Sequence, residues 1–200
     1  MDLEQLAIME RTYGPDSSET LTTLISVGHG YYELNRLAEA RTIFERVYEG
    51  QKIHLGEKHP TTLSALNNLA TLTRAVGDLE RAELLYMEVV ELRREVLGNL
   101  HAQTLNSLNN LGEHFLKLGD PESAAPYIEE ARQGRLTALG AHHIDSIESL
   151  VAIAKLRRAQ HRATEAAASL AEARALADAH LDPNQGVHAK IDALEQQFSE

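Results

Sequence analysis

The segment Leu55-Gly56-Glu57-Lys58-His59-Pro60 is followed by Leu66-Asn67-Asn68-Leu69-Ala70, and both segments return along the chain at a fixed distance. Leu97-Gly98-Asn99-Leu100-His101-Ala102 and Leu108-Asn109-Asn110-Leu111-Gly112 lie 42 residues later, and Leu139-Gly140-Ala141-His142-His143-Ile144 lies 42 residues later again. Similarity at one fixed period is the signature of a repeat architecture. The chain is therefore predicted to be an array of 42-residue units.

Glycine and aspartate mark the helix ends within each unit. Gly77-Asp78 recurs as Gly119-Asp120, and Asn35-Arg36 and His161-Arg162 are degenerate copies in the same register. Glycine readily adopts the left-handed conformation that ends many helices, and aspartate can cap the free amides of the next helix. Apolar residues on both sides of Gly77 recur at helical spacing. The second unit is thus predicted to contain helices over about 59–76 and 79–97, and no segment has the pattern of a strand.

Small residues occupy one position of the first helix and one position of the second helix in every unit: Gly28, Ala70, Gly112 and Ala154, and Ala40, Ala82, Ala124 and Ala166. A large residue follows the second set after four positions: Phe44, Tyr86, Ile128 and Leu170. One helix pair cannot bury its apolar face alone, so neighbouring pairs must stack. The pattern predicts an all-α fold, a right-handed α-solenoid of stacked antiparallel helix pairs of the tetratricopeptide type.

These motifs together resemble the repeats of kinesin light chains and related tetratricopeptide proteins. Ala124-Ala125-Pro126 is similar to the Ala-Glu-Pro segment in the second helix of that family, and the resemblance covers roughly residues 14–181. We expect one repeat domain over 1–200. Residues 1–13 are expected to be the tail of a partial repeat or a cap, and residues 182–200 a C-terminal capping helix. The four repeats between them are expected at 14–55, 56–97, 98–139 and 140–181.

One face of each first helix is expected to line the concave groove of the solenoid. At 100° per residue, the core residues Leu66 and Leu69 lie opposite Ser64, Asn67 and Thr71. The same face continues through Arg74 and Ala75, and its counterparts in the third and fourth repeats are Asn106, Asn109, Glu113, Leu116 and Lys117, and Glu148, Val151, Lys155, Arg158 and Ala159.

Asparagines give this face a means of holding a peptide. Asn67, Asn68, Asn109 and Asn110 place carboxamides, which both donate and accept, where an extended peptide could pair with them. The family resemblance implies the same role for the Asn pair. Alternatively, Asn68 and Asn110 bond to a neighbouring helix. The predicted peptide-binding residues are Asn67, Asn68, Thr71, Arg74, Asn106, Asn109, Asn110, Lys117, Lys155 and Arg158.

Four of these residues are cations in an acidic chain: Arg74, Lys117, Lys155 and Arg158. They could hold carboxylates of a ligand, and arginine can do so through two parallel hydrogen bonds. They could equally balance the nearby charges of Glu33 and Glu113. The predicted partner is a peptide or protein with acidic character.

Composition excludes several other functions. The net charge of −11 argues against binding to a nucleic-acid backbone, and the absence of cysteine removes thiolate metal sites and cysteine nucleophiles. His59, His101 and His143 recur with the repeat, so they are expected to cap helix starts rather than share a metal. No phosphate loop, nucleophile elbow, signal peptide or membrane-spanning run is found. We expect a cytoplasmic protein, monomeric or weakly self-associating, with no cofactor, metal or catalytic residues.

The leading hypothesis is a non-enzymatic scaffold that binds a peptide segment of a partner protein in its concave groove. The alternative is a self-assembling or intramolecular regulatory repeat module of a larger signalling protein. Incomplete repeats at residues 1–13 and after Asp182 motivate the alternative, because solenoid ends without polar caps expose apolar surface.

Overall fold

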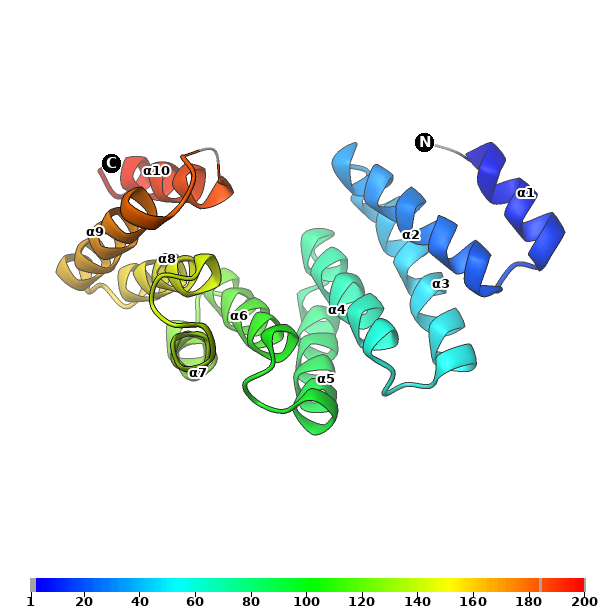
Figure 1. The fold of residues 1–200 in the computed structure, drawn as a ribbon, viewed down its shortest axis with the longest axis horizontal. Helices are drawn as coiled ribbons and strands as arrows, with labels where there is room; N and C mark the ends of the chain where they lie inside the picture. The colour runs from blue at the N-terminus through cyan, green and yellow to red at the C-terminus, as the bar shows by residue number, and fades with distance from the viewer. Residues whose placement is uncertain (1–2, 184, 200) are drawn as a thin grey trace. The chain divides into compact units, whose positions relative to one another are not determined.

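The computed structural model describes residues 3–183 and 185–199, which are helical apart from short turns and contain no strand (Figure 1). The chain forms two compact units, one ending at Val96 and the other beginning at Leu97. The first unit holds α1 to α5, at Leu3–Tyr13, Ser18–Glu33, Leu37–Leu55, Pro60–Ala75 and Leu79–Leu97, the last residue of α5 lying past the boundary. The second unit holds α6 to α10, at Ala102–Lys117, Pro121–Leu139, Ile144–Ala159, Ala163–His180 and Gly186–Ser199.

The histidines at the unit boundaries cap helices, as predicted. The Nδ1 atoms of His59, His101 and His143 each accept a hydrogen bond of 3.2 Å from the backbone N–H two residues later, at the starts of α4, α6 and α8. Ser17 fills the same register before α2, where its hydroxyl accepts from the N–H of Thr20. Each cap satisfies one of the amides that a helix start leaves without an intrahelical partner.

The turn inside each helix pair depends on a residue with positive φ. Gly77 and Gly119 have φ of 94° and 77°, and Asn35 and His161 in the same register have φ of 56° and 60°. The aspartates that follow the two glycines cap the next helix, since Asp78 and Asp120 accept from the N–H groups of Arg81 and Ser123. These turns match the expectation from the sequence.

Small residues at the helix crossings allow close approach, as predicted. A Cβ built on Gly112 would lie 2.4 Å from Cγ1 of Ile128, and one on Gly28 would lie 2.7 Å from the Phe44 ring. Ala70 and Ala154, in the same register, are fully buried. The four large partners, Phe44, Tyr86, Ile128 and Leu170, are also buried. The helix pairs therefore pack through matched small and large residues.

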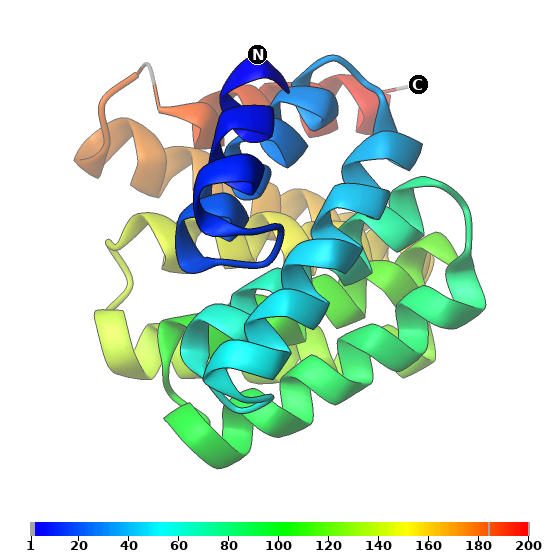
Figure 2. The same ribbon diagram turned by 90° about the vertical axis from the view of Figure 1, so that its right-hand side faces the viewer.

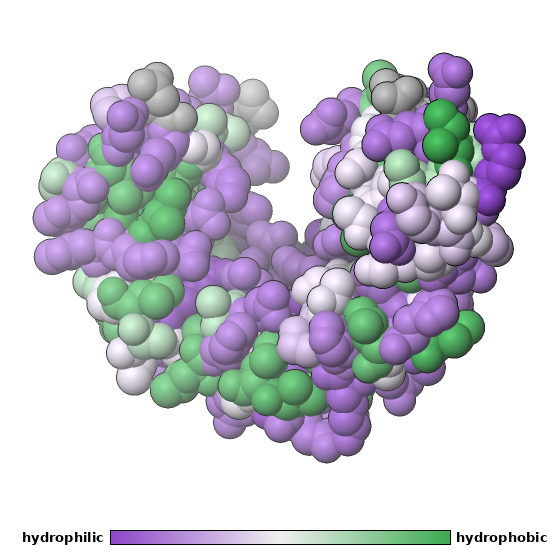
Figure 3. All heavy atoms as spheres, turned by 45° about the vertical axis from the view of Figure 1, so that its right-hand side comes forward, coloured by the Kyte–Doolittle hydropathy of each residue, from purple (hydrophilic) through white to green (hydrophobic). Residues whose placement is uncertain are grey.

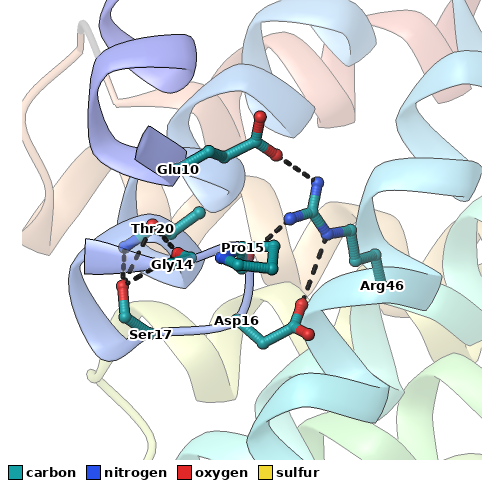
Figure 4. Close-up of polar contacts among 7 residues, drawn as sticks. All are labelled: Glu10, Gly14, Pro15, Asp16, Ser17, Thr20 and Arg46. Carbon is teal, nitrogen blue, oxygen red and sulfur yellow. Dashed lines mark hydrogen bonds and ion pairs between the residues drawn. The ribbon is translucent and has the colours of Figure 1, made fainter. Parts of the chain in front are cut away.

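A short helix precedes the first full pair. Figure 2 shows α1 beside α2, and Leu6 of α1 is buried in the same apolar cluster as Leu21 and Leu24. Arg46 of α3 reaches back to this region: it donates to the Glu10 carboxylate at 2.6 Å and to the carbonyl of Pro15 (Figure 4). Arg46 thus connects α1, the turn after it and α3.

Apolar and polar side chains are mixed on the visible surface, where green apolar patches are separated by purple hydrophilic residues (Figure 3). Large apolar side chains that remain exposed include Ile53, Leu84 and Leu34. Scattered apolar residues of this kind are normal on a protein surface.

Candidate functional site

In the first unit the predicted site residues lie along α4. Thr71 donates to the carbonyl of Asn67 at 3.0 Å and accepts from the Tyr86 hydroxyl at 3.1 Å. The Arg74 guanidinium lies over the Tyr86 ring, 5.4 Å from its centre. Tyr86 comes from α5 and its ring is fully buried, so a core residue holds Thr71 and Arg74 in place.

A small apolar hollow of about 120 Å³ opens beside these residues. It is lined by His29, Tyr32, Phe44, Asn68, Thr71 and Leu72. Of the predicted residues, Asn68 and Thr71 supply its polar part. The His29 ring meets the Phe44 ring edge to face, with 5.2 Å between their centres. The structure therefore brings α2, α3 and α4 together at this position.

In the second unit the predicted asparagines of α6 share one hollow of about 340 Å³. Asn106, Asn109 and Asn110 all line it, together with Glu113, Arg135, Glu148, Val151, Ala152, Lys155 and Lys190. Val151 was expected to point into the groove, but it is 4% exposed and packs mainly in the apolar cluster with Leu170 and Ile191. Apart from Val151 and Ala152, the residues that line this hollow are polar or charged.

Two ion pairs cross the polar hollow, each joining residues 42 positions apart. Lys155 lies 3.3 Å from the Glu113 carboxylate, and Lys190 of α10 lies 2.6 Å from the Glu148 carboxylate. The pairing of Lys155 with Glu113 is the charge balance that the sequence offered as an alternative to ligand binding. Glu148 was placed on the groove face by its register, whereas the contribution of Lys190 from α10 was not predicted.

The predicted cations Lys117, Lys155 and Arg158 meet at a wider hollow of about 550 Å³. Leu116 and Ala159 line it too, and α10 adds Leu194, Gln197 and Phe198. The Arg158 guanidinium lies over the Phe198 ring, 5.1 Å from its centre. Arg74, the fourth predicted cation, belongs to the first unit.

Two buried arginines of the second helices were missed by sequence reasoning. Arg93 and Arg135 are 42 residues apart and only 4% and 6% exposed. Arg135 donates to Oδ1 of Asn106 at 2.6 Å and to the carbonyl of Asp145 at 3.3 Å. Arg93 donates to the carbonyl of Leu63 and to the Ser64 hydroxyl, both at 3.4 Å. The signal for them in the sequence is their common register, since they lie one repeat length apart in second helices.

Burial opposes the charge on both arginines. It lowers the pKa of the Arg93 guanidinium to about 10. Burial also lowers the pKa of Arg135, although the negative charges of Asp145, Glu148 and Glu113 act in the opposite direction. Both groups therefore stay positively charged at neutral pH while most of their surface is removed from water.

Asn109 has a buried acceptor that lacks a donor. Its Oδ1 atom is inaccessible to water and has no hydrogen-bond partner. An unpaired buried polar atom of this kind costs about 1–3 kcal/mol.

The described residues contain no group of three histidine, cysteine or acidic side chains that could hold a metal ion. Within residues 3–183 and 185–199, no helix is both long enough and apolar enough to cross a membrane.

Comparison with known proteins identifies the repeats. The model of the tetratricopeptide repeat matches residues 2–53, 61–137 and 103–179, and no curated protein matches the sequence. A putative kinesin light chain of Podosopora anserina with nearly identical TPR-like repeats is 24% identical, with a TM-score of 0.74 over 90% of this chain and 86% of that one.

Two further solved structures share the fold. BtubC (BKLC) from P. vanneervenii is 21% identical, with a TM-score of 0.76 over 91% of this chain and 74% of that one. The apo form of RapI is 16% identical, with a TM-score of 0.79 over 99% of this chain and 70% of that one. The all-α repeat fold and the family are as predicted: the chain belongs to the tetratricopeptide repeat family, whose repeats typically serve protein–protein interaction.

Proposed function

We propose that this protein is a non-enzymatic scaffold that binds a peptide segment of a partner protein along the face of its first helices. The observation that carries the proposal is the polar hollow of the second unit, where Asn106, Asn109 and Asn110 line one open space. The unpaired Oδ1 of Asn109 lies among them.

Carboxamides suit peptide recognition because each can accept from a backbone N–H and donate to a backbone C=O. Such bonds do not depend on the peptide side chains, so specificity must come from the neighbouring groups. Lys117, Lys155 and Arg158 surround the adjacent hollow and favour a peptide with acidic residues. Their contribution will fall as salt concentration rises, because they are partly exposed.

The test is a random dodecapeptide array probed with the purified protein, followed by affinity measurements on one selected peptide. The Asn109→Ala/Asn110→Ala double variant, which changes two residues of the polar hollow in the second unit, should bind that peptide about 30-fold more weakly, since two lost hydrogen bonds of about 1 kcal/mol each give that factor. The matched control is Asn99→Ala, which removes the carboxamide of an exposed turn residue and should leave binding unchanged. A double variant that keeps its helical circular dichroism and binds as well as wild type would overturn the proposal.

A further inference from the structure

Three of the four helix pairs begin with a histidine that must be neutral to act as a cap. The Nδ1 atoms of His59, His101 and His143 each accept, at 3.2 Å, from the backbone N–H two residues later. An imidazole nitrogen accepts a hydrogen bond only while it carries no proton, so each cap requires the neutral ring with its proton on Nε2. Protonation of Nδ1 would replace the acceptor by a donor that faces the same N–H group.

The helix dipole acts in the same direction. The aligned peptide groups place a partial positive charge at the N-terminus of a helix, where a cation is unfavourable. The first turns of α4 and α6 contain no acidic residue that could offset a positive charge on His59 or His101. The first turn of α8 contains one, Asp145. The caps of α4 and α6 are therefore the most sensitive to protonation.

Neighbouring charges do not replace the missing acidic residues. Glu57 and Lys58, the charged residues before His59, are ion-paired with residues of α3 and α5 respectively. Residues 98–104 contain no charged side chain around His101, and α7 and α8 are the helices that pack against α6 in this unit. Within the described part of the chain, neither histidine takes part in an ion pair.

Contacts of opposite effect meet at the start of α8. The Asp145 carboxylate lies 3.8 Å from Nδ1 of His143 and can pair with the protonated ring, although it also acts electrostatically on the Arg135 guanidinium of α7. The ring of His142 stacks on that of His180 at the end of α9, with 4.0 Å between their centres. Positive charge on both stacked rings would be repulsive. Acidification therefore has both favourable and unfavourable effects at this helix start.

The nearby charged groups of α9 and α10 form pairs of their own. Asp178 of α9 lies 3.4 Å from Nε2 of His188 on α10, and Lys190 of α10 is paired with Glu148 of α8. The first pair becomes stronger when the histidine gains a proton, which opposes the loss of a cap. An informative comparison therefore changes only the capping residues.

The start of α2 provides an internal reference. Ser17 occupies the register of the three histidines, and its hydroxyl accepts from the N–H of Thr20 at 3.2 Å. Among the side chains with ordinary titration behaviour, only histidine changes its charge between about pH 5 and pH 8, so the serine cap does not depend on pH in this range. Successive repeats thus have one cap that does not titrate and three that do.

We propose that His59, His101 and His143 form a pH-sensitive device: mild acidification removes three caps together and loosens the starts of α4, α6 and α8, while α2 stays capped. The direction follows from the neutral state that the caps require. The stability that they contribute is present above the range in which histidine titrates and is lost as the pH falls through it. The device acts on the repeats themselves and does not require a bound peptide.

The test replaces the capping histidines by asparagine, which is among the best N-cap residues, offers Oδ1 as an acceptor and does not titrate. Thermal unfolding is followed by circular dichroism at about pH 7.5 and about pH 5.5, on either side of the ordinary titration of histidine. Between these conditions the midpoint of wild type should fall by about 6–12 °C more than that of His59→Asn/His101→Asn/His143→Asn, about 2–4 °C for each cap. His101→Asn alone should remove about a third of this difference.

His54→Asn is the matched control. His54 is an exposed histidine in the last turn of α3, where it caps no helix start, so its loss should leave the acid-induced fall as large as in wild type. If His54→Asn reduces the fall as much as His101→Asn does, the caps are not its cause and the proposal is wrong. The proposal is equally wrong if the triple variant and wild type lose the same stability on acidification.

Amide hydrogen exchange measured by NMR on wild type tests the proposal without any variant, and decides alone if the triple variant does not fold. After correction for the intrinsic effect of pH on exchange, the amides of Thr61 and Gln103 should lose about 5-fold in protection between the two conditions, the value of one cap. The amide of Thr20, capped by serine, should keep its protection. Unchanged protection of Thr61 and Gln103, or an equal loss at Thr20, would overturn the proposal.

Discussion

At the scale of single residues, the four turns inside the helix pairs need the same backbone conformation but do not have the same residue. Gly77 and Gly119 reach positive φ without a Cβ clash, and Asn35 tolerates it through its short polar side chain. His161, with φ of 60°, has neither advantage. This residue is therefore the most strained of the four.

His161→Gly is expected to stabilise the protein by about 0.5–1 kcal/mol, because relief of the left-handed strain exceeds the entropy that glycine loses on folding. Urea unfolding followed by circular dichroism would measure the difference. Asn35→Gly is the control at the same register and should give a smaller gain, since the short side chain of asparagine can hydrogen-bond locally in this conformation. A loss of stability in His161→Gly would show that the histidine side chain stabilises the turn.

At the scale of helices, the distance between the two members of a pair depends on which small residue lies at their crossing. Gly112 on α6 faces Ile128 on α7, and the Ala124 carbonyl lies 3.3 Å from where its Cβ would be. In the preceding repeat the same register holds Ala70, so that pair is built around one additional methyl group.

Gly112→Ala should destabilise the protein by about 1–3 kcal/mol, because the new methyl group would overlap Ile128 and a backbone carbonyl limits the relaxation. Thermal unfolding would report it as a lower midpoint. The control is Gly186→Ala at the start of α10, where a Cβ meets nothing within 4 Å, and which should be neutral or slightly stabilising. Equal effects of the two substitutions would show that crowding at the α6–α7 crossing is unimportant.

At the scale of the whole molecule, the residues of α10 bear on whether the repeats associate with further copies. Ile147, Leu150 and Ala154 form the buried face of α8, and the residues 42 positions later are Ala189, Asp192 and Gln196, which are all exposed. Asp192 is ion-paired with Arg174 of α9. The face that would accept a second helix in a complete repeat is polar on α10.

Asp192→Leu/Gln196→Leu should therefore convert this polar face of α10 into an exposed apolar surface that promotes self-association. We expect the apparent mass in light scattering to rise with protein concentration for the double variant and to stay constant, or rise less, for wild type. Ala167→Leu/Ala171→Leu places two leucines with the same spacing on the exposed side of α9 and is the matched control. Equal self-association of all three proteins would show that the chain associates through another surface and would favour the self-assembly hypothesis.

Much of the fold could be predicted from the sequence because the information is local and repeated. The turn residues and the capping histidines contact only residues a few positions away along the chain. Each of them also recurs after 42 residues, so the same signal can be read in more than one repeat. The observed α4, at Pro60–Ala75, agrees with the predicted helix over about 59–76. Helical periodicity also placed Asn106, Asn109 and Asn110 on one face, and the three do line one hollow.

The sequence by itself determined the family, the helix pairs and their turns, because these depend on contacts within one repeat. Only the tertiary structure decided which charges meet: Lys155 with Glu113, Lys190 with Glu148, and Arg135 with the neutral side chain of Asn106. These contacts join different helices, and the side chain of an arginine or lysine is long enough to choose among several partners. Whether a charge is paired therefore depends on distances between side chains of different packed helices. These distances cannot be predicted from the periodicity of a single helix.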